Sequence, residues 1–213
     1  MHIHALEVSN NSIFLNLYKN LSSNLKLVLL LTDETIFIQE LQNDKTKEKA
    51  FRQLITLYKE RLYWHIRKIV ISHDDADDVL QNTFIKIFRN LSKFKQDSKL
   101  FSWMYRIATN EAITFINKRA KDRNQEVAEM QTNLASDLGS DNYFSGDEIQ
   151  IILQKAVASL PEKQRLVFNM KYFDELKYEE ISEILETSVG GLKASYFHAV
   201  KKIEQFIKSY QLN

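Results

Sequence analysis

The scarcity of glycine and proline constrains the fold of this chain more than any other feature of its sequence. Among 213 residues there are four glycines and one proline. A β-sheet protein needs many tight turns, and those turns rely on glycine and proline for their backbone angles. The sequence therefore predicts an all-α fold. Cysteine is absent as well, which excludes disulfides and thiolate metal sites and suits a reducing compartment.

The formal net charge is only +1, but the charges are unevenly distributed. Residues 84–123 carry ten Lys or Arg against three acids, and residues 187–213 carry four Lys against one Glu. Residues 124–149, which separate them, carry six acids and no base. Two basic blocks of this kind indicate a nucleic-acid partner. No apolar run approaches the ~20 residues of a membrane span. The first ten residues lack the basic start of a secretory signal, so we expect a cytoplasmic protein.

Apolar residues recur at helical spacing in two separate parts of the chain. In the first part, a long helix covers about 50–69, Ser72 caps a second helix that runs to about 91, and a third covers 100–119. In the second part we expect helices over 149–158, 162–173 and 178–186, and a last one from Ser188. Ser159 and Glu162 have capping-box spacing.

The pattern divides the chain into four parts. These are an N-terminal extension of unknown role over residues 1–31, a first helical domain over 32–121, a flexible acidic linker over 122–147 and a second helical domain over 148–213. The acidic linker either mimics nucleic acid or is an ordinary disordered segment. His2 and His4 form an H-x-H pair, which a floppy terminus explains better than a metal site.

Residues 178–207 have the pattern of a helix-turn-helix motif, whose second helix enters the DNA major groove. Ser188 can cap that helix, and Gly190 and Gly191 follow at once. The amino end of a helix attracts phosphate, and glycines let the backbone approach it closely. A flexible turn without a ligand is the alternative. The outward face carries Lys193, Ala194, Phe197, His198 and Lys201. Phe197 either contacts a thymine methyl group or packs against another helix.

The helix predicted over 100–119 also has two distinct faces. One is the apolar side that we expect to be buried, with Met104, Ala108, Ala112, Phe115 and Ile116. The other carries Trp103, Arg106, Asn110, Thr114 and Asn117. Aromatic rings, amides and cations in one row suit unstacked bases. A helix with a polar surface and a core tryptophan explains the same spacing.

Three stretches of the first domain resemble bacterial sigma factors of the extracytoplasmic-function (ECF) group, in the sigma-70 family. They read DDADDVLQNTF from Asp74, FKQDS from Phe94 and WMYRIATN from Trp103. The stretch LPEKQR from Leu160, together with the helix-turn-helix, resembles their second domain. The resemblance covers residues 32–208.

The resemblance implies an alternative sigma factor, which binds core RNA polymerase, directs it to promoters and helps to melt the −10 region. The first domain would read the −10 element and the second the −35 element. Positions matched to the melted −10 strand are Phe94, Lys95, Ser98, Trp103, Arg106, Asn110, Thr114 and Asn117. Positions matched to the −35 element are Ser188, Gly190, Gly191, Lys193, Ala194, Phe197, His198 and Lys201. Positions matched to the polymerase surface are Asp75, Asp78, Gln81, Asn82 and Lys86.

The chain departs from the family pattern at several of these positions. The family often has Glu where Asn82 stands and usually Thr where Gly191 stands. It has Arg where Ser195, and often His198, stand, so we expect weaker phosphate attraction here. The resemblance implies a further partner, an anti-sigma factor. We expect no enzymatic activity, no cofactor, no metal and no small-molecule substrate. The main rival is a transcriptional regulator that binds an operator through the helix-turn-helix without core polymerase.

Overall fold

Every regular element in the described part of the chain is a helix, which confirms the all-α prediction there. The structure is a computed structural model and describes residues 34–127, 129–130, 133 and 148–211. The predicted extension over 1–31 and most of the predicted linker over 122–147 lie outside these residues. The chain divides into two compact units, residues 1–53 and 54–213.

The described part of the first unit is a short helix followed by the start of a longer one. Residues 34–42 are helical, and α3 (Lys47–Val70) begins after a tight turn. In that turn the Lys45 amide donates to Asn43 Oδ1 at 3.0 Å, and Thr46 Oγ1 donates to the Glu40 carbonyl at 2.8 Å. These side-chain bonds satisfy backbone groups that the helix ends leave open.

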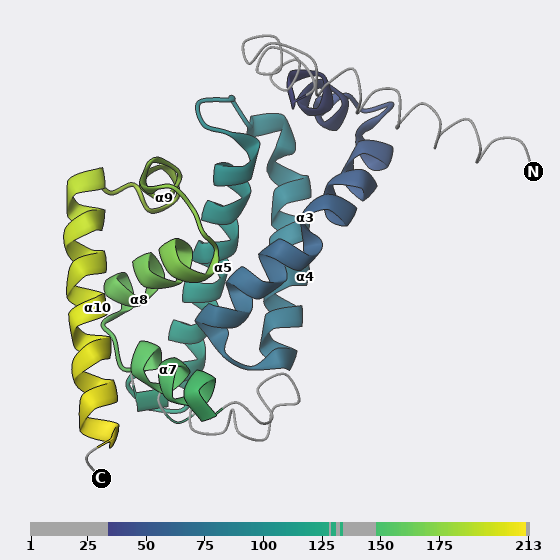
Figure 1. The fold of residues 1–213 in the computed structure, drawn as a ribbon. Coiled ribbons are helices and arrows are strands. Elements are labelled where there is room, and N and C mark those ends of the chain that lie inside the picture. Colours follow the sequence, from purple (N-terminus) through teal and green to yellow (C-terminus); the bar gives the residue numbers. More distant parts are fainter. Residues whose placement is uncertain (1–33, 128, 131–132, 134–147, 212–213) are drawn as a thin grey trace, which may run out of the picture. The chain divides into compact units, whose positions relative to one another are not determined.

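The second unit begins with the rest of α3, followed by α4 (His73–Asn90), the short η1 (Leu91–Lys93) and α5 (Leu100–Asp122). Ser72 caps α4 as predicted, since its Oγ accepts from the Asp75 amide at 3.4 Å. Helix α4 packs along α5 (Figure 1). The apolar stripe of α4 is buried, from Ala76 through Leu80, Phe84 and Ile87. In α3, by contrast, the apolar residue Leu57 is 61% exposed.

The second unit continues, after the undescribed residues, with α7 (Glu148–Ala158), α8 (Glu162–Phe168), η3 (Asn169–Phe173), α9 (Tyr178–Leu185) and α10 (Val189–Gln211). Helix α10 packs on α7, α8 and α9 (Figure 1). Its apolar side joins one core cluster, which contains Ala156, Val157, Leu160, Phe168, Ala199 and Ile203. The predicted helix over 162–173 has the right extent, but η3 is a π-helix, a wider turn than the sequence pattern indicates.

The connection between α7 and α8 differs from the predicted capping box. Ser159 Oγ donates to the Ala156 carbonyl at 2.7 Å, and Pro161 occupies the cap position of α8, so the prediction is wrong. Arg165, only 3% exposed, donates instead to the carbonyls of Ala158 and Leu160 at 3.3 and 3.1 Å. Burial lowers the pKa of Arg165 to about 10. This arginine therefore satisfies carbonyls where the chain leaves α7.

Candidate nucleic-acid interface

The two faces predicted for α5 are present in the structure. Met104, Ala108, Ala112 and Ile116 are buried, at 0–1% exposure, whereas Phe115, predicted on the same side, is only half-buried. Asn110, Thr114 and Asn117 are exposed, and Trp103 and Arg106 are half-buried. The amide, hydroxyl and aromatic groups therefore line the outer side of one rigid helix. Such a row can stack on unpaired bases and hydrogen-bond to their edges.

The loop that precedes α5 contacts one residue of this row, Trp103. Phe94 is only 6% exposed, and its ring lies 5.0 Å from the Trp103 ring, centroid to centroid. Lys95 is exposed and Ser98 is half-buried. Gln96 has φ 61, in the left-handed region, and turns the chain between them. Phe94 thus contributes chiefly by holding Trp103, whereas Lys95 is open to a ligand.

Arg106 is already bonded to another part of the unit. Its Nη1 donates to Glu186 Oε1 at 2.9 Å, and its Nη2 donates to the Glu183 carbonyl at 2.5 Å. Nearby, Lys99 Nζ lies 3.7 Å from Glu180 Oε1. These three acidic residues all belong to α9 or to the residue that ends it. Arg106 thus meets the carboxylate of Glu186 and the backbone carbonyl of Glu183, and Lys99 approaches the carboxylate of Glu180.

The turn between α9 and α10 is built by local bonds. Glu186 ends α9 with φ 50, in the left-handed region, where a non-glycine residue is uncommon. Ser188 Oγ accepts from the Gly191 amide at 3.3 Å, which confirms the predicted cap. A Cβ on Gly191 would lie 3.3 Å from that same oxygen, but a Cβ on Gly190 would meet no atom within 4 Å. Gly191 leaves room for the cap, whereas no neighbouring atom in the described unit requires a glycine at position 190.

The outward face of α10 is open to solvent. Lys193, Ala194, His198 and Lys201 are exposed, and Phe197 is 58% exposed. Lys201 Nζ lies 5.8 Å from the Phe197 ring centroid, within cation–π range. On the opposite side Leu192 and Ala199 are fully buried. Phe197 is therefore not a core residue of this unit. Of the two interpretations given above, packing against another helix is not seen within the unit.

The residues predicted to meet polymerase lie on α4, but not all of them point outward. Asp78, Gln81, Asn82 and Lys86 are exposed. Asp78 and Gln81 line a hollow of about 370 Å³ between α3 and α4. Asp75, in contrast, forms an ion pair with Arg119 of α5, with its side chain 14% exposed. Asp75 is thus engaged inside the unit.

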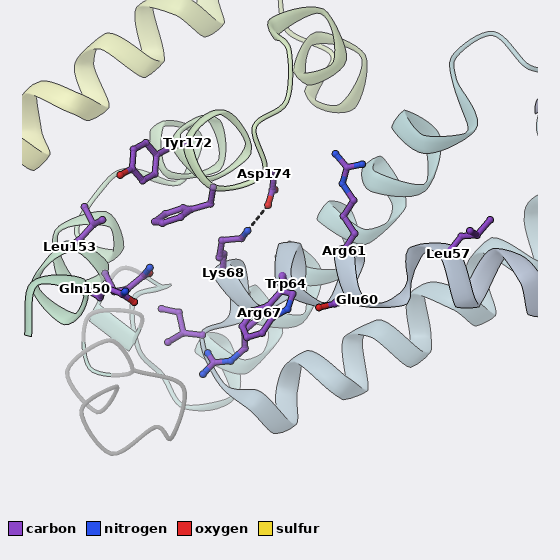
Figure 2. Close-up of a pocket in the computed structure, with 13 residues that line it drawn as sticks. Leu57, Glu60, Arg61, Trp64, Arg67, Lys68, Gln150, Leu153, Tyr172 and Asp174 are labelled. Atoms are coloured by element: carbon purple, nitrogen blue, oxygen red, sulfur yellow. Dashed lines mark hydrogen bonds and ion pairs between the residues drawn. The ribbon is translucent and has the colours of Figure 1, made fainter. Parts of the chain in front are cut away.

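A buried polar cluster, which sequence reasoning missed, joins α3 to the segment after η3. His65 Nδ1 lies 2.8 Å from Asp174 Oδ2, and His65 Nε2 lies 2.9 Å from Thr109 Oγ1. Lys68 also pairs with Asp174, as Figure 2 shows. The side chains of His65 and Asp174 are 1% and 4% exposed. Burial alone would raise the pKa of Asp174, but hydrogen bonds and charges from His65 and Lys68 outweigh it and hold that pKa below its usual value.

This cluster borders a cleft of about 730 Å³ (Figure 2). Its walls come from α3, including Trp64, from α7, including Leu153, and from η3, including Tyr172. The exposed Leu57 is one of the residues that line this cleft.

Two family models match this chain, one over each of the two helical surfaces described above. One, described as Sigma-70 region 2, matches residues 54–122, and the other, described as Sigma-70, region 4, matches residues 150–203. The first contains α4 and α5, and the second contains the helix-turn-helix. The chain belongs to the sigma-70 family of sigma factors.

Curated relatives place this sigma factor in the ECF group. It is 28% identical over 186 residues to the ECF RNA polymerase sigma-E factor of Haemophilus influenzae, a match that covers 84% of this chain and 96% of that protein. It is 29% identical over 186 residues to the protein of the same name from Escherichia coli strain K12, covering 84% of this chain and 95% of the relative.

Solved structures share the fold of the sigma factor. The structure of CnrH in complex with the cytosolic domain of CnrY matches with a TM-score of 0.60 and 20% identity, covering 83% of this chain and 97% of CnrH. The sigma factor RpoE in complex with the anti-sigma factor NepR, from Bartonella quintana, matches with a TM-score of 0.58 and 22% identity, covering 75% and 98%. Among the residues that our structure describes, no helix combines the length and apolarity needed to cross a membrane. No cluster of metal-ligating side chains occurs in those same residues.

Proposed function

We propose that this sigma factor binds core RNA polymerase through α4, reads the melted −10 strand with the outer face of α5, and reads the −35 element with α10. The observation that carries the proposal is the pair of outward polar faces on α5 and α10. Each faces away from a buried apolar side, and each lies in a different family region. Two separated elements of one promoter need two such surfaces.

Recognition and strand opening would form one event at α5. Taking a base out of a duplex costs a few kcal/mol, and a site that accepts only the extruded base recovers that cost. Asn110 and Thr114 offer an amide and a hydroxyl at exposed positions, and Trp103, held by Phe94, offers a ring. No covalent bond is broken in this process, so we propose that the protein is not an enzyme and needs no cofactor.

At α10, duplex DNA would be held by its phosphates and read at its base edges. The exposed Gly190 leaves the amino end of the helix open to a phosphate. Lys193, Ala194, Phe197 and His198 are exposed along the helix, on the side that would face the major groove. Phe197, at 58% exposure, is suited to a thymine methyl group.

We further propose an anti-sigma partner. The two solved structures that share this fold are complexes, CnrH with the cytosolic domain of CnrY and RpoE with the anti-sigma factor NepR. Since RNA polymerase works on chromosomal DNA, the place of action would be the cytoplasm. The rival, an operator-binding regulator, is not favoured, because it leaves α4 and α5 without a role although a sigma-70 region 2 model matches them.

In-vitro transcription tests the proposal directly. Core RNA polymerase is incubated with genomic fragments, with and without the purified chain, and start sites are mapped. We expect new start sites only with the chain, and co-elution of the chain with core polymerase in stoichiometric amounts. If the chain binds DNA fragments without associating with core polymerase, the operator-binding regulator is correct and the proposal is wrong.

A further inference from the structure

The aromatic ring of Tyr178, the first residue of α9, lies beside a lysine proposed for the −35 element. Lys193 Nζ is 5.7 Å from the centroid of this ring, within the range of a cation–π interaction. Lys171 Nζ of η3 lies 5.2 Å from the same centroid and also donates to the Leu176 carbonyl at 3.1 Å. One side chain on the first helix of the helix-turn-helix therefore attracts a cation on the second helix.

The Tyr178 ring is itself held by packing and by the start of its own helix. It meets the Tyr196 ring of α10 edge to face, with centroids 6.5 Å apart, and Tyr196 in turn stacks on Phe168 at 5.8 Å. Phe168 is 4% exposed and belongs to the core cluster of α7, α8 and α10. The Lys177 amide donates to Glu180 Oε2 at 2.9 Å, which closes the first turn of α9. Contacts other than the cation therefore fix the position of the ring.

Lys193 and Lys201, both exposed on α10, differ in the charge that surrounds them. Lys201 Nζ lies 3.5 Å from Glu204 Oε2, so a carboxylate partly offsets its charge. In the part of the chain that the structure describes, Lys193 forms no ion pair. An aromatic face attracts an ammonium group without neutralising it and leaves its three N–H donors able to bond elsewhere. Lys193 is therefore restrained by a neighbour and still able to donate to an acceptor on DNA.

We infer that Tyr178 is a positioning residue for −35 recognition, and that its ring holds the Lys193 ammonium in place for an acceptor on the −35 duplex. The inference rests on the proposed function, because it needs Lys193 to contact that duplex. A lysine side chain is long and flexible, and ordering it on binding costs conformational entropy. A ring that restricts the side chain beforehand lowers this cost. Tyr178 thus contributes to affinity for DNA through Lys193 rather than through a contact of its own.

Nuclear magnetic resonance of the free, full chain tests the contact itself. The ring current of an aromatic side chain shifts the resonances of protons that lie beside it. The Lys193 ε-methylene resonance, assigned by its absence from Lys193→Met, should therefore return towards the usual lysine position in Tyr178→Leu. The matched control is Tyr172→Leu, which removes an exposed ring that stacks on Phe168, and it should leave the resonance unchanged. An unchanged resonance in Tyr178→Leu would overturn the inference.

A double-mutant cycle in the holoenzyme tests the consequence for DNA binding. Affinity is compared between promoter fragments with and without the −35 element, and the ratio gives the −35-dependent affinity. Tyr178→Leu should lower this ratio roughly two- to fivefold, the range of an exposed cation–π contact. Tyr178→Phe keeps the ring and should match the wild type. In the Lys193→Met background, Tyr178→Leu should cause no further loss, because the cation that the ring positions is absent.

A ring of unchanged shape gives the same test where Tyr178→Leu does not fold. Fluorination of the ring in Tyr178→Phe weakens the negative potential of its face and preserves its size. The −35-dependent affinity should fall as fluorines are added when Lys193 is present, and should stay constant in Lys193→Met.

An equal loss from Tyr178→Leu in the two backgrounds would show that the ring acts on the fold, and it would overturn the inference. A loss from Lys193→Met without any loss from Tyr178→Leu or from fluorination would also overturn it, while the proposed role of Lys193 would stand. Failure of the proposed function has a different signature, since Lys193→Met would then leave the −35-dependent affinity unchanged. That result would remove the proposed role of Lys193 and the inference together.

Discussion

At the scale of single residues, we expect Gly190 to have opposite effects on the stability of the fold and on the proposed DNA binding. It lies in the first turn of α10, and an added Cβ would meet no atom within 4 Å. Glycine destabilises a helix by roughly 1 kcal/mol relative to alanine. The fold would therefore be more stable with alanine, and the proposed approach of a phosphate to the helix end gives the glycine its reason.

Gly190→Ala should raise the free energy of unfolding by up to about 1 kcal/mol and weaken binding to −35 duplex DNA. Urea unfolding measures the first effect, and fluorescence anisotropy with a duplex selected by the wild-type holoenzyme measures the second. Gly191→Ala is a useful comparison, because its Cβ would crowd Ser188 Oγ at 3.3 Å and disturb the cap. Stabilisation without any loss of DNA affinity would contradict the phosphate role.

Phe197 gives a second residue-scale prediction. Replacing thymine by deoxyuridine in the −35 duplex removes one methyl group and leaves base pairing intact. Burying such a group contributes about 0.8 kcal/mol, so wild-type affinity should fall roughly fourfold at the contacted position. Phe197→Ala should bind both duplexes alike. Equal sensitivity of the wild type and Phe197→Ala to deoxyuridine would exclude the methyl contact.

Asn110 should matter for opening rather than for recruitment. Its amide is exposed on α5. In the proposed role it would contact a base only after the duplex has melted. Asn110→Ala should reduce permanganate reactivity of −10 thymines about tenfold, the loss of one to two base hydrogen bonds, with co-elution on core polymerase unchanged. Normal permanganate footprints with this variant would show that the base is held elsewhere.

At the scale of helices, α10 has one face buried in the core and an opposite face exposed to solvent. Leu192 and Ala199 are buried, whereas Lys193, the residue after Leu192, is exposed. Lys193→Ala should weaken use of the −35 element while leaving core binding intact. The comparison is transcription from promoters with and without a −35 element, at two salt concentrations, since a lost phosphate contact should also reduce the salt dependence. A parallel loss of core binding would mean that the helix itself is damaged.

Helix faces were predictable from the sequence, because they follow from the 3.6-residue period alone. The buried row of Met104, Ala108, Ala112 and Ile116 is confirmed, as are the Ser72 and Ser188 caps. The fold class needs little more than this. The period does not show which apolar residues line a cleft, as Leu57 does, because a cleft forms from distant parts of the chain.

Partners of polar residues were not predictable in the same way. Ser159 and Glu162 have the spacing of a capping box, but Arg165 reaches the free carbonyls instead. His65 and Asp174 are 109 residues apart, and Arg106 and Glu186 are 80 apart. No local pattern encodes such pairs. The DNA and polymerase roles of the site residues stay predictions for the experiments above.

At the scale of the whole second unit, the buried Asp174 makes stability depend on pH. His65, Lys68 and, through its charge interaction, Tyr105 face this carboxylate. The pKa of Asp174 is depressed in the folded state, so its contribution to stability is fully present above the unfolded value of about 3.9. That contribution is lost as the pH falls through the lower folded pKa.

Urea unfolding of the wild type and of Asp174→Asn, between about pH 6 and pH 2, measures this contribution. The wild type should be more stable by about 2 kcal/mol at the upper end, and the difference should shrink below about pH 4. A constant difference across the range would mean that Asp174 acts by shape rather than by charge.

The bonds from Arg106 to α9 have a consequence for how the factor travels in the cell. A bacterial chromosome offers millions of non-specific sites, and exposed cations would spread an unaccompanied factor across them. If Arg106 contacts DNA as we propose, its internal bonds should leave fewer copies bound to bulk chromosome and more copies available to encounter polymerase. The internal bonds would then act on the search, before any promoter is reached.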